Sequence, residues 1–469
     1  MDIKLEKGRA VSGTVTAITS KSYVHRLLLA SALCKDKVSI FSNILSKDME
    51  ATIRVINTLG GYISVEQISR DSGEKKGYLF TAQRSLFEGA KLCRDQGSSD
   101  PVVLDCGESG STARFILPVA PLFADNVTVT GSGKLPERPM GPLCDVLRSA
   151  GVSASSDYLP ITLSGKPCAG DYKIAGNVSS QFITGLLFML SLLEGKSTLM
   201  IEGELESAPY VDMTVDVLEK FGVDCEAENR SFVAYQAREG LHYNADGRDD
   251  SSTDDAVVIA AEGDWSNAAY IMAIASLGCG SGFEDIMIEG LNSESIQGDR
   301  EIISLLDKFG VSIRKSGNGV NCGYRVCGNP YRSIDADCSQ IPDLVPALAV
   351  VAAYNEGDSI FRNVERLRIK ECDRIDAVTD MLSVVGVKVD ITRNEGHENM
   401  IVHGKGMNRP VAETITIESR NDHRIAMAAA AIAFAEKEPV IIKDAMAVNK
   451  SYPGFYDVIE QLGMHRVML

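Results

Sequence analysis

Two sequence phrases alternate along this chain of 469 residues, and each occurs six times. The first is an amphipathic stretch that ends in glycine and runs into a strand-like segment, as in VLEKFGVDCE and LLDKFGVSIR. Because glycine accepts a positive φ angle without steric cost, each glycine is typical of a left-handed helix cap. The six glycines lie roughly 70 to 90 residues apart, too far for a solenoid repeat. They are Gly60, Gly151, Gly222, Gly310, Gly386 and Gly463.

The second phrase starts with small polar residues and continues into a helix of small apolar residues, as in SGSTARFILPVAPLF and NDHRIAMAAAAIAFA. The starts are N-cap signals, and a helix that is apolar on every face must be buried. A β-rich run such as VTVTGSG follows each helix. Three copies precede about residue 240 and three follow about residue 255, which predicts two similar lobes of three repeats. The acidic stretch 244–256 between them is typical of a surface segment near a domain junction.

Composition and charge exclude several classes of protein. The 45% hydrophobic and 24% charged residues are ordinary for a globular chain, and a net charge of −17 argues against binding nucleic acid or an anionic membrane. We find no signal or transit peptide at the N-terminus and no transmembrane span. The eleven cysteines form no C-x-x-C pair and the six histidines show no ligand spacing, so we expect a reduced cytoplasmic protein without a structural metal.

Cationic residues recur where these helices begin. A helix N-terminus carries partial positive charge and unpaired N–H groups, so it disfavours basic side chains and binds anions. The recurrence of lysine and arginine at these unfavourable positions predicts a ligand with several negative charges, such as phosphate plus carboxylate. The candidates are Lys21, Arg26, Arg114, Arg138, Lys370, Arg374, Arg424 and Lys450. Simpler interpretations stay open for some neighbours: Ser109 can be an N-cap, Asp343 a dipole partner, and Asp422 a residue that orients an arginine.

The motifs that contain these residues resemble those of the 5-enolpyruvylshikimate-3-phosphate synthases. The resemblance covers essentially the whole chain and rests on SKSYVHR, GESGSTARF, ERPMGPL, GNVSSQFITGLL, SAPYVDMT, EGDWSNAAY, IPDLVPALA, RIKECDRI, NDHRIAMA and KSYPGF. It implies a two-lobed, inside-out α/β barrel, the enolpyruvyl transferase fold, with six βαβαββ repeats, three in each lobe. We therefore expect a first lobe of residues 1–19 and 251–469, on the phosphoenolpyruvate side and with the catalytic acid and base. Residues 20–250 would form the shikimate 3-phosphate lobe.

The same resemblance implies the site residues. The expected contacts to shikimate 3-phosphate are Lys21, Ser22, Arg26, Ser179, Ser180, Gln181, Ser207, Asp343 and Lys370. Those to phosphoenolpyruvate are Lys21, Gly110, Arg138, Gln181, Arg374, Arg424 and Lys450. Asp343 and Glu371 correspond to the proposed proton acceptor and donor, and Lys21 would share the proton transfer. No metal or organic cofactor is implied, and we expect a monomer that acts on small molecules.

The sequence departs from the family pattern at several positions. Ile18-Thr19 replaces the usual Pro-Gly, Val24 stands where Ser is common, and Glu108 and Arg366 each replace a frequent Asn. One alternative function is UDP-N-acetylglucosamine carboxyvinyltransferase, whose mobile loop carries a cysteine where this chain has Gly133. Another is a catalytically silent relative that binds metabolites, which the intact Lys21, Asp343 and Glu371 disfavour.

Overall fold

The computed structural model describes residues 1–8, 12–68, 77–95, 101–228, 231–235, 241–243, 257–278, 285–394, 396–407 and 414–469. It divides into two compact units, which we name unit 1 (residues 1–20 and 262–469) and unit 2 (residues 21–261). The chain therefore passes between the units twice, at 20/21 and at 261/262. The acidic stretch 244–256 and the predicted boundary at 250/251 lie outside the described residues.

The described residues form six four-stranded sheets with one shared topology, in which the first two strands are parallel and the others pair antiparallel. In unit 2 the sheets are β14 (Val257–Ala260), β3 (Val38–Ser42), β5 (Gly77–Arg84), β4 (Tyr62–Ile68); β6 (Val102–Asp105), β7 (Asn126–Thr130), β9 (Ile161–Ser164), β8 (Ser153–Ala154); and β10 (Asp171–Ala175), β11 (Lys196–Glu202), β13 (Ser231–Tyr235), β12 (Cys225–Glu228). In unit 1 they are β2 (Gly13–Thr16), β15 (Ile286–Leu291), β17 (Cys322–Cys327), β16 (Ser312–Ser316); β18 (Asp335–Asp337), β19 (Glu356–Arg362), β21 (His397–Lys405), β20 (Lys388–Asn394); and β22 (Ile415–Glu418), β23 (Val440–Lys443), β1 (Ile3–Lys7), β24 (Met464–Met468).

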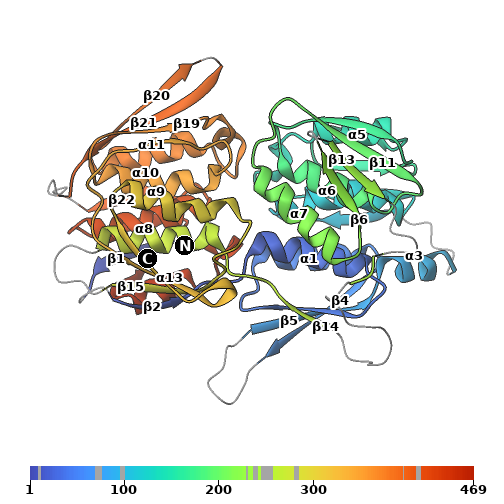
Figure 1. Cartoon of the computed structure of the whole chain (residues 1–469), viewed down its shortest axis with the longest axis horizontal. Helices are drawn as coiled ribbons and strands as arrows, with labels where there is room; N and C mark the ends of the chain where they lie inside the picture. Colours follow the sequence, from blue (N-terminus) through green and yellow to red (C-terminus); the bar gives the residue numbers. More distant parts are fainter. Residues whose placement is uncertain are drawn as a thin grey trace. The chain divides into compact units, whose positions relative to one another are not determined.

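A buried helix precedes the second strand of each sheet along the chain, and several of these helices are labelled in Figure 1. These helices are α1 (Lys21–Leu33), α4 (Gly110–Val119) and α6 (Ser180–Leu190) in unit 2, and α8 (Trp265–Gly278), α10 (Val345–Ala353) and α12 (His423–Ala435) in unit 1. In unit 1 the three helices pack on one another pairwise, and every residue of α8 and α10 is buried. Their small apolar side chains allow this close packing, so they form the core of the unit.

A second helix follows the second strand of each sheet along the chain and ends two residues before one of the six predicted glycines. These helices are α2 (Lys47–Thr58), α5 (Gly141–Ser149), α7 (Ala208–Lys220), α9 (Ile302–Lys308), α11 (Arg374–Val384) and α13 (Phe455–Gln461), and α3 (Leu86–Asp95) is an addition to the first repeat of unit 2. All six glycines have positive φ, from 73° at Gly222 to 111° at Gly60. The predicted repeat of buried helix, strand, half-exposed helix and glycine cap is confirmed. Among the described residues, no helix is both long and apolar enough to cross a membrane.

Candidate functional site

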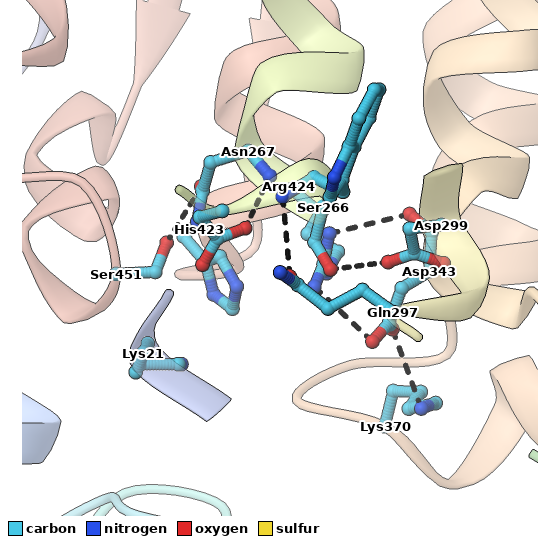
Figure 2. Close-up of polar contacts among 12 residues, drawn as sticks. Lys21, Ser266, Asn267, Gln297, Asp299, Asp343, Lys370, His423, Arg424 and Ser451 are labelled. Carbon is cyan, nitrogen blue, oxygen red and sulfur yellow. Dashed lines mark hydrogen bonds and ion pairs between the residues drawn. The ribbon is translucent and has the colours of Figure 1, made fainter. Parts of the chain in front are cut away.

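A cluster of charged side chains surrounds Asp343 in unit 1. Asp343 lies in the 3-10 turn η5 (Pro342–Leu344) that leads into α10, and its side chain is 14% exposed. Its Oδ1 accepts a hydrogen bond from Arg374 Nη1 at 2.8 Å, and Lys370 Nζ lies 3.4 Å from the same oxygen. Its Oδ2 lies 3.1 Å from Arg424 Nη2. One carboxylate therefore meets three cations, of which Lys370 and Arg424 are labelled in Figure 2.

The guanidinium of Arg374 is the buried centre of this cluster, with 1% of its side chain exposed. Its Nε donates to Asp422 Oδ2 at 2.8 Å and its Nη2 donates to Glu371 Oε2 at 2.7 Å. Burial acts to lower the pKa of Arg374, but Asp422, Glu371 and Asp343 together raise this pKa well above its ordinary value. Arg374 is therefore a permanent cation that aligns three carboxylates.

Lys370 has a different electrostatic setting. Burial, together with the charges of Arg374 and Arg366, lowers the pKa of Lys370 to about 8 against the opposing effect of Asp343. A lysine with this pKa exchanges a proton near neutral pH more readily than an ordinary surface lysine. The predicted role of Lys370 is a binding contact, and its setting beside Asp343 also allows its ammonium to exchange a proton.

The polar start of α12 is explained by two hydrogen bonds of Asp422. This residue is fully buried and caps the helix, because its Oδ1 accepts from the backbone N–H of Arg424 at 2.8 Å. Asp422 also orients an arginine, one of the roles that its position in the sequence leaves open, and the guanidinium that it holds is that of Arg374. The guanidinium of Arg424 instead pairs with Asp343 and lies 6.0 Å from the ring centre of Tyr270. The charged side chains of Asp422 and Arg424, at the N-terminus of α12, thus belong to the cluster around Asp343.

Lys450 and Asp299 complete the polar surroundings. Lys450 ends the 3-10 helix η7 (Ala445–Lys450), and its Nζ donates to the backbone carbonyl of Asn421 at 2.7 Å. Asp299 in η3 (Gly298–Glu301) is buried and accepts a hydrogen bond from Ser266 (Figure 2). Burial and the charge of Asp343 raise the pKa of Asp299 to about 6, against the effect of Arg424. Asp299 could not be identified from the sequence, because it does not lie in one of the predicted helix starts that carry a cationic residue.

In unit 2, the start of α1 presents Lys21, whose Nζ lies 2.8 Å from Asp48 Oδ2 of α2. Arg26, one turn later, is buried and makes four hydrogen bonds within the unit, among them Nε to Thr214 Oγ1 at 2.9 Å and Nη1 to the Ser22 carbonyl at 2.7 Å. Burial lowers the pKa of Arg26 to about 10. Lys21 therefore lies at the start of α1 beside the Asp48 carboxylate, whereas Arg26 links α1 to α7 by hydrogen bonds.

The starts of α4 and α6 are joined by hydrogen bonds of Gln181. Its Oε1 accepts from Arg114 Nη1 at 2.5 Å, and its Nε2 donates to Ser111 Oγ at 2.8 Å. Ser179 caps α6 by accepting from the backbone N–H of Gln181 at 3.3 Å. A Cβ atom placed on Gly110 would lie only 2.9 Å from Arg138 Nη1, so this guanidinium lies directly against the first residue of α4.

The remaining predicted residues of unit 2 also stand at helix starts. Ser180 is the first residue of α6 and is buried, and Ser207 precedes α7 with a left-handed backbone, φ 54°. The structure therefore brings together Gly110, Arg138 and Gln181 through Arg114 and Ser111 in unit 2, and Asp343, Lys370, Glu371, Arg374 and Arg424 in unit 1. Cations at capped helix starts can bind phosphate and carboxylate groups, and a carboxylate among them can accept a proton. In the described part of the chain, no cluster of His, Cys, Asp and Glu is arranged to hold a metal ion.

Comparison with known proteins places these features in a family. The sequence model described as EPSP synthase (3-phosphoshikimate 1-carboxyvinyltransferase) matches residues 5–459. Two relatives, from Clostridium novyi and Clostridium kluyveri, are named 3-phosphoshikimate 1-carboxyvinyltransferase. Each is 36% identical, with 97% of this chain and 95% of the relative covered.

Solved structures show the same fold. The EPSP synthase from Acinetobacter baumannii has a TM-score of 0.74 at 22% identity, with 100% of both chains covered. The enolpyruvyl transferase NikO from Streptomyces tendae has a TM-score of 0.73 at 17% identity, with 100% of this chain and 99% of that chain covered. At these identities the likeness concerns the fold alone, and it confirms the predicted two-lobed α/β class.

Proposed function

The chain belongs to the EPSP synthase family, and from that premise we propose which of its residues carry each step of the reaction. The enzyme is a 3-phosphoshikimate 1-carboxyvinyltransferase of the shikimate pathway to aromatic amino acids. It transfers the carboxyvinyl group of phosphoenolpyruvate to the 5-hydroxyl of shikimate 3-phosphate and releases phosphate. The hydroxyl adds to C2 of phosphoenolpyruvate while C3 gains a proton, and loss of that proton with phosphate from the tetrahedral adduct gives the product.

Asp343 is the base that takes the proton of the 5-hydroxyl. The observation that carries this proposal is the position of its carboxylate, 14% exposed and bounded by Arg374, Lys370 and Arg424. The three cations stabilise negative charge around the reacting atoms and restrict the carboxylate to one place. Glu371, with 26% of its side chain exposed and its Oε2 held by Arg374, shares proton transfer at C3 with Lys21.

The binding residues follow the same grouping. Shikimate 3-phosphate takes contacts from Lys21, Ser22, Arg26, Ser179, Ser180, Gln181, Ser207, Asp343 and Lys370, and phosphoenolpyruvate from Lys21, Gly110, Arg138, Gln181, Arg374, Arg424 and Lys450. Hydroxyls and backbone N–H groups at helix starts suit phosphate oxygens, and paired arginines suit a carboxylate. The direct test is phosphate release from phosphoenolpyruvate, with shikimate 3-phosphate or UDP-N-acetylglucosamine as acceptor. Release with the first acceptor supports the proposal, whereas release with the second alone, or with neither, contradicts it.

The geometry at Gly133 disfavours the UDP-N-acetylglucosamine alternative. The rival family carries a cysteine at this position, but here the backbone has φ 58° and a Cβ atom would lie 2.7 Å from Cδ of Glu108. Any side chain at residue 133 would therefore be strained and would displace Glu108. The loop of this chain is shaped for glycine and not for a reactive cysteine.

Substitution of Gly110 by alanine should raise the KM for phosphoenolpyruvate about tenfold, with a smaller change in kcat. The added methyl group would lie 2.9 Å from Arg138 Nη1 and 3.1 Å from Arg114 Nη1, so both guanidiniums must move. A charge-assisted hydrogen bond contributes about 1.5–3 kcal/mol, and about 1.4 kcal/mol corresponds to a tenfold change in affinity. Steady-state kinetics with varied phosphoenolpyruvate measures the effect.

The matched control is Gly141→Ala. Gly141 is likewise the first residue of a helix, α5, but the atom nearest to its added Cβ would lie 3.5 Å away, an ordinary contact. We expect this variant to keep the KM of the wild type. An unchanged KM in Gly110→Ala would remove Gly110 and Arg138 from the phosphoenolpyruvate site.

We further infer that the chain acts as a monomer in the cytoplasm. A net charge of −17 opposes self-association, and the eleven cysteines, without paired spacing, are typical of a reducing compartment. Light scattering should give a mass near 50.5 kDa, and twice that mass would contradict the monomer.

A further inference from the structure

His25 in α1 is buried, with 1% of its surface exposed, and the reaction scheme above gives it no role. It lies one helical turn after Lys21. Its Nδ1 lies 2.7 Å from Oγ1 of Thr52, which belongs to α2. The imidazole edge meets the ring of Phe115 in α4, with the ring centres 6.4 Å apart. His25 therefore contacts two other helices of unit 2, α2 and α4.

A series of hydroxyl groups continues from Thr52 to the start of α4. Thr52 Oγ1 lies 2.7 Å from Thr112 Oγ1, which donates to Ser109 Oγ at 2.7 Å. Each hydroxyl has one proton, so Thr112 must accept from Thr52 if it donates to Ser109. Thr52 then accepts from the ring N–H of His25, because its own proton goes to Thr112. Thr52 Oγ1 also lies 3.4 Å from the backbone carbonyl oxygen of Asp48, a longer contact than the 2.7 Å to Thr112. The shorter contacts run from His25 Nδ1–H through Thr52 and Thr112 to Ser109, and we call this series the α1–α4 relay.

His25 also lines a cavity of about 10 Å³, and its other ring nitrogen is Nε2. Within the described residues, Nε2 has no hydrogen-bond partner. The cavity is at the lower limit for one water molecule, and its apolar lining comes from Leu29, Val55, Ile56, Phe115 and Ile116. Such a site does not solvate a positive charge. Burial, with the charges of Lys21 and Arg26, holds the pKa of His25 well below its usual value, so the ring is neutral.

The relay connects two helix starts that carry proposed binding residues. At its first end, α1 begins with Lys21, which is also tied to α2 through Asp48. At its other end, Ser109 caps α4 by accepting from the backbone N–H of Thr112 at 3.3 Å, and the next residue is Gly110. Capping of α4 requires only the hydrogen bond from the Thr112 backbone N–H to Ser109. The two additional hydroxyl contacts and the histidine fix α4 relative to α1.

We infer that neutral His25 is a positioning residue that holds Lys21 and Gly110 at the spacing required for phosphoenolpyruvate, acting through Thr52, Thr112 and Ser109. The inference rests on the proposed function, which assigns both residues to this substrate. His25 itself touches no substrate in this scheme. Its contribution is a fixed tautomer whose single ring N–H starts the relay.

The test uses the full-length enzyme with Thr52→Val and Thr112→Val, which keep the shape of the side chain and remove its hydroxyl. Each removes the two hydrogen bonds that its hydroxyl makes in the relay. Part of that loss should reach the binding site and raise the KM for phosphoenolpyruvate by about 3- to 10-fold, with kcat within about twofold of the wild type. Thr52→Ser and Thr112→Ser keep the hydroxyl and should restore the KM. A role in stability alone would lower Tm in the valine variants and leave the KM unchanged, and that result would overturn the inference.

Two further measurements keep the result decisive. If Thr112→Val fails to fold because it lies in the cap, Thr52→Val, which lies in the middle of the relay, carries the kinetic test. NMR of ¹⁵N-labelled histidine should show His25 protonated at Nδ1 and bare at Nε2 in the wild type, and an Nε2-protonated or doubly protonated ring would overturn the relay. Lack of wild-type activity with shikimate 3-phosphate would refute the proposed function itself, an outcome that the unmutated enzyme reveals first.

Discussion

Replacement of Asp343 by asparagine should lower kcat by about 10²- to 10⁴-fold, the usual contribution of a general base. The amide has the shape of the carboxylate but cannot accept the proton of the 5-hydroxyl. The fold should persist, because Arg374, the most buried cation of the cluster, keeps its hydrogen bonds to Asp422 and Glu371. Phosphate release at saturating concentrations of both substrates measures kcat, and circular dichroism checks the fold.

The matched control is Asp373→Asn, which makes the same chemical change 30 residues further along the chain. Asp373 caps α11, where its Oδ1 accepts from the backbone N–H of Ile375 at 3.0 Å, and it also pairs with Arg368 at 2.8 Å. Asparagine is a comparably good N-cap, and the ion pair with Arg368 is partly exposed, so this variant should keep its kcat and lose no more than about 1 kcal/mol of stability. If Asp343→Asn retained kcat within tenfold of the wild type, Asp343 would not be the base.

The repeat architecture could be predicted from the sequence because each of its signals is local. A glycine that ends a helix reports its own backbone conformation, as Gly60 and Gly463 do with φ of 111° and 101°. A small-residue apolar segment such as α8 reports its own burial. Neither signal requires knowledge of which helix lies next to which.

The partners of the charged side chains could not be predicted in this way. Arg374 and Asp422 are 48 residues apart in sequence and meet only because α11 and α12 are neighbours. The cationic helix starts indicated that anions bind there. The cationic residues did not indicate that carboxylates of the same chain, above all Asp343, would form ion pairs with several of them. The hydroxyl contact of Thr52 with Thr112, across 60 residues, was hidden for the same reason.

Removal of the Asp422 carboxylate, as in Asp422→Ala, should destabilise the fold by about 3 kcal/mol. Asp422 is fully buried, and its loss leaves the Nε of a 1% exposed guanidinium without its carboxylate acceptor and α12 without its cap. Breaking one side of a buried ion pair costs about 3–5 kcal/mol, and we expect the lower end because Arg374 keeps Glu371 and Asp343. The shift of the urea unfolding midpoint measures the effect. The control Asp380→Ala removes the exposed partner of Arg420 and should cost no more than about 1 kcal/mol.

A double-mutant cycle separates the ion pair from the cap. Arg374→Met alone leaves the Asp422 carboxylate buried without this cation, whereas the double variant with Asp422→Ala leaves neither charge behind. The two single losses should therefore sum to more than the loss in the double variant, by about 1–3 kcal/mol, because residues in one buried network are coupled. The cap lost in Asp422→Ala is lost equally in the double variant and cancels in this difference. Additive losses would mean that Asp422 stabilises α12 through its cap and contributes nothing through the guanidinium that it holds beside Asp343.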